Sequence, residues 1–166
     1  MDDRVSVGTA AAETTWALRQ EVLRPGRAVR DCIYPGEADP RAAHVAAVSS
    51  DTGAVVAVGV VMPEPPPWDS NKGDGWRVRG MATRPGARGR GLGGRVLDLL
   101  LAHVAAHGGG LVWCNARTPA LHLYERAGFL PRGDVFDLPE IGPHQVMWST
   151  VAPLREPAVP DGPASP

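Results

Sequence analysis

Residues 76–104, WRVRGMATRPGARGRGLGGRVLDLLLAHV, join a strand-like run to an amphipathic helix through a turn of glycine and arginine. A helix that begins at such a turn has unpaired backbone N–H groups at its N-terminus, and these groups bind phosphate or pyrophosphate. Glycines let the backbone approach a ligand closely, and arginines add positive charge. The turn contains both kinds of residue: Arg88, Gly89, Arg90, Gly91, Gly93, Gly94 and Arg95. The stretch therefore predicts an anion-binding site.

Two familiar phosphate-binding motifs can be compared with this turn. A P-loop needs lysine and Ser/Thr after its second glycine, but leucine and glycine follow Gly91, so this motif is excluded. Gly89, Gly91 and Gly94 match the spacing of the dinucleotide fingerprint. Against it, residues 84–88 separate the strand from the first glycine, and no acid follows the next strand to hold a ribose hydroxyl. A dinucleotide-dependent oxidoreductase stays open as an alternative.

A third motif, [Arg/Gln]-x-x-Gly-x-[Gly/Ala], is met by Arg88-Gly89-Arg90-Gly91-Leu92-Gly93 and resembles the acetyl-CoA pyrophosphate signature of the GNAT superfamily of N-acetyltransferases. Downstream, residues 120–129, ALHLYERAGF, resemble the GNAT helix that carries a tyrosine and is followed by Gly-Phe. Leu123 stands where an aromatic residue often precedes that tyrosine. With the strand order, the resemblance covers roughly residues 1–150.

The resemblance implies an α/β (α+β) fold with a mixed, mostly antiparallel central sheet, flanked by helices and splayed between strands 76–83 and 111–116. The pantetheine arm of acetyl-CoA, the co-substrate, would lie in that gap along the backbone of Met81, Ala82 and Thr83. Its pyrophosphate would bind the amides of residues 88–94. Asn115 matches a position that contacts the cofactor arm, although it could equally cap the turn that follows. Tyr124 matches the general acid, with a core aromatic as the alternative.

Apolar spacing predicts the other elements. We expect a short strand at 5–7, a helix at 10–23, and hairpin strands at 44–50 and 54–62 that are covered on both faces. Helix 92–107 should bury Leu92, Val96, Leu99, Leu100 and Val104, and a further helix should begin at Thr118-Pro119 and end at Gly128. Segments 129–138 and 144–151 resemble a closing antiparallel pair. The domain would span residues 1–151, followed by a proline-rich, disordered tail at 152–166.

The composition suits one globular domain, with 166 residues of which 43% are hydrophobic. A net charge of −1 gives no case for a nucleic-acid or membrane partner. No apolar signal core or bilayer-spanning run is present, so the expected location is cytoplasmic. Cys32 and Cys114 form no CxxC pair, and neither a disulfide framework nor a metal site is expected.

The general base is not assigned by sequence. Many GNAT relatives carry a glutamate on the strand equivalent to 76–83, and this strand has none. The candidates elsewhere are Glu37, Asp39, His44, His122 and His144, with a water chain as the alternative. Residues 37–39 with His44, together with Leu18-Arg19 and Gly142-Pro143-His144, resemble the ElaA-like group of GNAT proteins.

The acceptor pocket is expected among residues 27–39, the loop 63–75 and the segment near His144. Acids at Asp31, Glu37 and Asp39 would favour a cationic amine there. The sequence thus predicts an N-acetyltransferase that moves an acetyl group from acetyl-CoA to a primary amine of a small molecule or peptide by direct attack, with Tyr124 as the catalytic acid. A homodimer is compatible with this prediction. A non-catalytic acyl-CoA-binding regulator is the alternative, because the base is unassigned.

Overall fold

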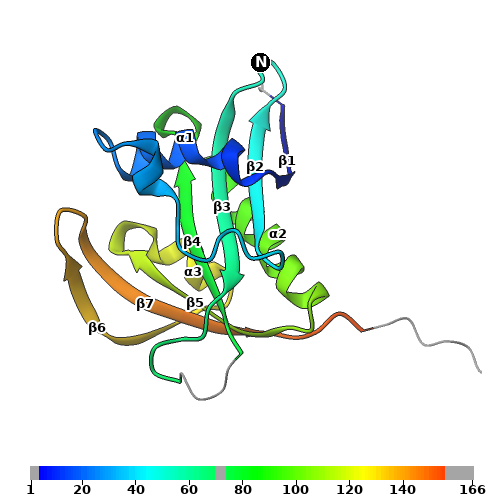
Figure 1. The fold of residues 1–166 in the computed structure, drawn as a ribbon, viewed down its shortest axis with the longest axis vertical. Helices are drawn as coiled ribbons and strands as arrows, with labels where there is room; N and C mark the ends of the chain where they lie inside the picture. The colour runs from blue at the N-terminus through cyan, green and yellow to red at the C-terminus, as the bar shows by residue number, and fades with distance from the viewer. Residues whose placement is uncertain (1–3, 70–73, 156–166) are drawn as a thin grey trace, which may run out of the picture.

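The computed structural model describes residues 4–69 and 74–155, which form one sheet flanked by helices (Figure 1). Its seven strands lie in the order β1-β2-β3-β4-β5-β7-β6. The strands are β1 Val5–Ala10, β2 Ala43–Ser49, β3 Val55–Pro63, β4 Trp76–Thr83, β5 Gly110–Arg117, β6 Leu130–Leu138 and β7 Gly142–Val151. The helices are α1 Ala12–Leu23, α2 Leu92–Ala106 and α3 Leu121–Arg126, with short 3₁₀ turns η1 Val29–Cys32, η3 Pro85–Ala87 and η4 Thr118–Ala120.

The sheet divides between β4 and β5, its one parallel pair. These strands are joined through Trp76↔Val112 and Arg77↔Trp113, at the start of β4, and then diverge. Farther along, β4 pairs with β3, and β5 pairs with β7 over its whole length. In Figure 1, β5, β7 and β6 run at an angle to β1–β4. The mixed, mostly antiparallel sheet splayed between these two strands, which the sequence predicted, is confirmed.

Helices cover both faces of the central strands. The main core joins α2 to residues of the sheet, while Leu18 of α1 packs with Ala46, Val58 and Ala82 on the other face. The prediction that strands 44–62 are covered on both sides is therefore confirmed. On α2, Leu97 is buried in place of Leu99, which is 37% exposed. At about 100° per residue, the buried arc is centred near Leu100, and Leu99 lies just outside it.

Several boundaries differ from the sequence-based expectation. β1 runs to Ala10, where the first helix was expected to begin, and α1 starts at Ala12. Thr118 does not cap a helix with its side chain, because η4 occupies residues 118–120 and α3 begins at Leu121. At the other end, the predicted tail at 152–166 begins with an ordered contact, in which the amide of Leu154 donates to the carbonyl of Ala105 at 3.0 Å. Residues 156–166 lie outside the described residues. Among the helices that the structure describes, none is long and apolar enough to cross a membrane.

A β-bulge interrupts β4 halfway along its length. The register changes from Val58↔Ala82 to Val60↔Arg79, so that β4 has one more residue than β3 between these pairs. Gly80 sits in the bulge with a φ of 61°. A Cβ at this position would lie 2.8 Å from Nε of Arg19, and therefore only glycine is accommodated without a shift of the surroundings.

The irregular segment between α1 and β2 is held by one buried carboxylate. Glu37 is 4% exposed and accepts hydrogen bonds from Trp16 Nε1 at 2.6 Å, Arg19 Nη1 at 2.6 Å and the Tyr34 amide at 3.0 Å. Arg19 is fully buried. Burial alone would raise the pKa of Glu37, but the Tyr34 amide, Arg19 and Trp16 together lower it below its usual range. The ion pair therefore fixes this segment against α1.

We predict that Glu37→Gln lowers the free energy of unfolding by about 3–5 kcal/mol, because it leaves the Arg19 charge buried without a counter-ion. Asp39→Asn, which alters an exposed pair with Arg41, is the matched control and should have little effect. Urea denaturation measures both. The lowered pKa of Glu37 stabilises the fold above the unfolded-state pKa of about 4.3, and this contribution is lost as the pH falls through the folded-state value. The difference from wild type should therefore shrink below pH ~4; a constant difference would contradict the assignment.

Candidate active site

The glycine turn before α2 forms an open backbone cradle. Gly91 is the N-cap of α2 with a φ of 70°, and Gly89 has a φ of 77°. The first helical amide bonded within α2 is that of Arg95, which donates to Gly91 O at 3.1 Å, so the amides before it have no acceptor in the helix. A Cβ placed on Gly89, Gly91 or Gly94 would meet no atom within 4 Å. The cradle is open space bordered by N–H donors, which suits a pyrophosphate.

Two arginines of the turn bind the neighbouring backbone. Arg88 Nε donates to Thr83 O at 3.2 Å, and Arg95 Nη2 donates to Val5 O at 3.3 Å. Arg90 is exposed. The first two guanidiniums therefore brace the turn against β4 and β1 while keeping positive charge beside the cradle.

The splay exposes backbone groups on both strands that border it. Met81, Ala82 and Thr83 lie beyond the last β4–β5 pair, so their edge toward β5 has no strand partner. The same divergence opens the β4-facing edge of β5 at Asn115. Met81 itself packs over Gly59, where an added Cβ would lie 2.4 Å from its sulfur. An extended ligand could thus pair with β4 in the place that β5 leaves.

Tyr124 lies in the core rather than on the surface. It is 5% exposed, and its ring contacts Phe129 edge-on at 5.5 Å between centroids. Cys114 on β5 lies near enough to interact electrostatically with the Tyr124 hydroxyl. Burial, with Cys114 nearby, raises the pKa of Tyr124 well above its usual value, so the phenol stays protonated at neutral pH. Burial also raises the pKa of Cys114 to about 12, so its thiol is not a nucleophile at neutral pH.

The structure separates the five candidate bases. Glu37 is occupied by its three donors, and Asp39 forms an exposed ion pair with Arg41 at 2.9 Å. The buried His44 has its Nε2 3.9 Å from Glu37, so it belongs to the Glu37 network, and burial lowers its pKa. His122 is exposed on α3. The expectation that Glu37 lines an acidic acceptor pocket is therefore wrong, because Glu37 is buried and Arg19 neutralises its charge.

His144 is placed differently from the other candidates. It lies on β7 directly opposite Arg117 of β5, at the splayed end of the sheet. Its Nδ1 is 2.7 Å from the carbonyl oxygen of Gly142. Because a carbonyl only accepts, Nδ1 carries the proton in the neutral ring, and the lone pair is on Nε2. His144 is thus a buried imidazole whose tautomer suits proton acceptance.

Sequence reasoning missed three residues that lie near the β4–β5 split: Arg79, Arg117 and Tyr34. Arg79 on β4 and Arg117 on β5 lie on the sheet face opposite α2, and Tyr34 lies against the bulge at Gly80. The alternation of residues 76–79, Trp-Arg-Val-Arg, was a signal for Arg79, because the two apolar positions are the buried ones. No local pattern marks Tyr34.

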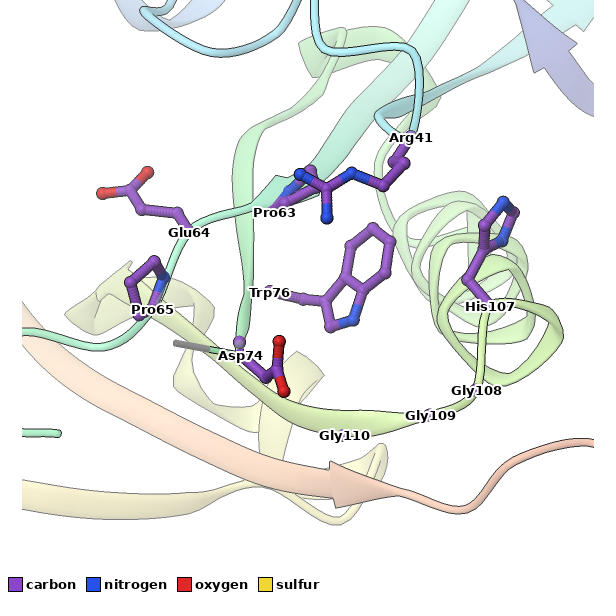
Figure 2. A pocket seen from close by; sticks show the side chains of 11 residues that line it. Arg41, Pro63, Glu64, Pro65, Asp74, Trp76, His107, Gly108, Gly109 and Gly110 are labelled. Carbon is purple, nitrogen blue, oxygen red and sulfur yellow. The ribbon is translucent and has the colours of Figure 1, made fainter. Parts of the chain in front are cut away.

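Figure 2 shows a pocket of about 530 Å³ elsewhere in the protein. Arg41, Glu64, Asp74, Trp76 and His107 line it, together with the glycines at the end of α2. It therefore lies at the closed end of the β4–β5 split, at the opposite end of α2 from the glycine cradle. Within the described part of the chain, no group of three His, Cys, Asp or Glu side chains is placed to hold a metal ion.

The geometry can be compared with known proteins. The chain belongs to the acetyltransferase (GNAT) family, which it matches over residues 11–129. It is an acetyl-CoA-dependent N-acetyltransferase. A dinucleotide-dependent oxidoreductase is thereby excluded, and the two-pair contact of β4 and β5 agrees with this, because a dinucleotide-binding sheet has continuous parallel pairing.

Relatives are found both by sequence and by fold. The chain is 29% identical over 151 residues to the uncharacterized N-acetyltransferase YitI of Bacillus subtilis (strain 168), covering 91% of this chain and 99% of the relative. Its fold resembles the ribosomal-protein-S18-alanine N-acetyltransferase of Escherichia coli with a TM-score of 0.69 and 14% identity, covering 92% and 97% of the two chains. A phosphinothricin acetyltransferase of Sinorhizobium meliloti in complex with AcCoA gives 0.65 and 18%, covering 89% of each.

Gly91→Val should weaken acetyl-CoA binding by about tenfold or more, because a branched side chain would enter the cradle and strain a backbone with positive φ. Gly108→Val is the matched control, since Gly108 also has a positive φ and open surroundings but lies at the far end of α2. Calorimetric titration of both folded variants measures the effect. Equal loss of affinity in the two variants would attribute it to strain and not to the cradle.

Proposed function

We propose that this protein acetylates a primary amine by direct attack of the amine on acetyl-CoA. The observation that carries the proposal is the unpaired edge of β4 at Met81–Thr83, which leads to the open cradle at Gly91. Bound acetyl-CoA would supply the acetyl group as a thioester. In this proposal the backbone from Met81 to Thr83 holds the pantetheine arm, and the amides of residues 88–94 hold the pyrophosphate.

Catalysis would depend mainly on positioning. The bulge at Gly80 turns the backbone of Met81 out of the β3 register, so that an N–H group near Met81 can polarise the carbonyl oxygen of the thioester. Asn115, on the opposite edge of the split, is proposed to contact the cofactor arm. If the protein holds the amine and the thioester together in this gap, their reaction no longer depends on a bimolecular encounter. Few reactive side chains are then required.

Tyr124 is proposed as the acid that gives a proton to the departing sulfur. Its raised pKa keeps the hydroxyl protonated, and its neighbour Cys114 belongs to β5, which borders the split. His144 is proposed as the base, directly or through water. His144 lies directly opposite Arg117 of the adjoining β5, so the two side chains share one face of the sheet. Acid and base would thus act from opposite faces of β5.

Tyr124→Phe keeps the ring and deletes the proton donor, so acetyl-CoA affinity should persist while kcat falls by about tenfold or more. The loss should shrink with an acetyl thioester whose thiol is more acidic, because such a thiolate leaves without protonation. Cys114→Ser alters a buried neighbour of Tyr124 without removing its proton donor, and it serves as the control for packing. An unaltered kcat under conditions where chemistry limits the rate would show that the proton comes from elsewhere.

His144→Gln should lower kcat by about tenfold or more, since glutamine can hydrogen-bond but cannot accept a proton at neutral pH. His122→Gln, on the exposed face of α3, is the matched control and should leave kcat unchanged. Steady-state acetylation, followed by coenzyme A release at saturating acetyl-CoA, measures both variants. Equal rates for the two variants would remove His144 as the base.

A further inference from the structure

Arginines dominate the sheet face that borders the split opposite α2. Trp76 and Val78 of β4 belong to the core under α2, so the alternate residues Arg77 and Arg79 point to the other face. On β5, Val112, Cys114 and Ala116 are in the same core, and the alternate residue Arg117 therefore shares the face of Arg79.

Tyr34 connects these arginines to the buried ion pair. The guanidinium of Arg79 lies over its ring at 4.0 Å from the centroid, and that of Arg19 lies at 4.8 Å. Gly80 permits this arrangement, because a Cβ there would lie 3.0 Å from the Tyr34 ring. Arg117 reaches from β5 to α1, where its Nη2 donates to Leu23 O at 3.1 Å. Arg79 and Arg117 are therefore held in place from the two sides of the split.

The two arginines differ from their neighbours in having no counter-ion. Arg19 is paired with Glu37, and Arg77 with Glu64 at 2.8 Å. Within residues 4–69 and 74–155, no carboxylate forms an ion pair with Arg79 or Arg117. Burial lowers the pKa of Arg79, and the charge of Arg77 lowers it further; burial and the charge of Arg24 do the same for Arg117. Both guanidiniums nevertheless stay charged at neutral pH. Unpaired, half-buried cations are costly unless an anion completes the site.

We propose that the acceptor is a primary amine that also carries an anionic group, a carboxylate or a phosphate, which Arg79 and Arg117 bind. This inference rests on the proposed acetyltransferase function and names its substrate class. Arg79 immediately precedes the bulge, and the β4–β5 register places Arg117 about level with Met81 across the split. An anion between the two guanidiniums would bring a nearby amino group to the bulge. This proposal of an anionic acceptor differs from the sequence-based expectation of a cationic acceptor, which was inferred from the acids at residues 31–39.

The same charges would help the amine to react. With a singly charged carboxylate bound, the two guanidiniums leave a net positive charge, and this lowers the pKa of the nearby ammonium because like charges disfavour the protonated form. The ammonium proton passes to Nε2 of His144 or to water, and the neutral nitrogen then forms a bond to the acetyl carbon. The carbon–sulfur bond breaks with its electron pair on sulfur, which takes a proton from Tyr124. The acylated nitrogen loses its second proton to water, and this proton replaces the one that Tyr124 gave up. The products are the acetamide of the anionic acceptor and coenzyme A.

Matched pairs of amines test the proposal with the full-length protein and acetyl-CoA. L-Phenylalanine is compared with 2-phenylethylamine, L-leucine with 3-methylbutylamine, and O-phosphoethanolamine with ethanolamine. We expect the anionic member of at least one pair to have a kcat/KM about tenfold or more above its partner, because charge-assisted hydrogen bonds form only with that member. The first two pairs report a carboxylate and the third reports a phosphate. If, in every pair, the amine that lacks the anionic group has an equal or greater kcat/KM, the inference is overturned. The acetyltransferase function would still stand.

Variants locate the anion site. Arg79→Gln and Arg117→Gln should each raise KM for the preferred anionic acceptor by about tenfold while leaving acetyl-CoA affinity unchanged, and Arg79→Lys should restore part of the loss. Arg41→Gln, in the pocket of Figure 2, is the matched control. A raised KM in Arg41→Gln with no change in Arg79→Gln would place the acceptor in that pocket and overturn the inference. Binding of acetyl-CoA without transfer to any amine would instead refute the proposed function, and the inference with it.

Discussion

The buried pair of Glu37 and Arg19 supports the side of the candidate active site that contains Tyr34 and the bulge at Gly80. One carboxylate collects donors from α1 and from the irregular segment after it, so a stretch without regular structure acquires a fixed position. Arg19, held by that carboxylate, lies against the bulge at Gly80 and beneath the ring of Tyr34. Tyr34 in turn holds Arg79. Because a buried charge without its partner is strongly destabilising, these positions are coupled: the bulge at Gly80, the position of Arg79 and the packing of α1 depend on one ion pair.

Divergence of β4 from β5 is the second constraint, and it determines what can bind. A parallel pair normally continues along the strands, but here the sheet is completed on the far side of β5 by β7. Beyond Arg77 and Trp113 the two strands have no strand partner on the edges that face each other, and backbone groups at such edges have hydrogen-bonding capacity to satisfy. An extended ligand with amide groups of its own meets this need better than water does, whereas a compact ligand would leave part of it unmet.

Much of this architecture could be predicted from the sequence, and the failures have physical reasons. Strand 76–83, the glycine turn and the helix after it were recognisable because their patterns are local and periodic. The position of β7 between β5 and β6 was not, since strand order depends on long-range pairing that leaves no local signal. Glu37 was recognised as a notable acid but misplaced: a sequence shows that a carboxylate is present, not which charge neutralises it. Arg79 and Arg117 were missed for the same reason, because their contacts with Tyr34 and with α1 form only in the folded chain.

The strand order also has a consequence for how the chain folds. β1 to β4 form three consecutive antiparallel pairs, and they can form a sheet as soon as residue 83 is available. β5 can pair along its full length only later, because its partner β7 follows β6 in the chain. Non-local pairings of this kind form slowly, and during synthesis the C-terminal part is the last to emerge. The split proposed to bind the cofactor is therefore bounded on one side by an early-forming unit and on the other by a late one, so such a site would be complete only at the final stage of folding.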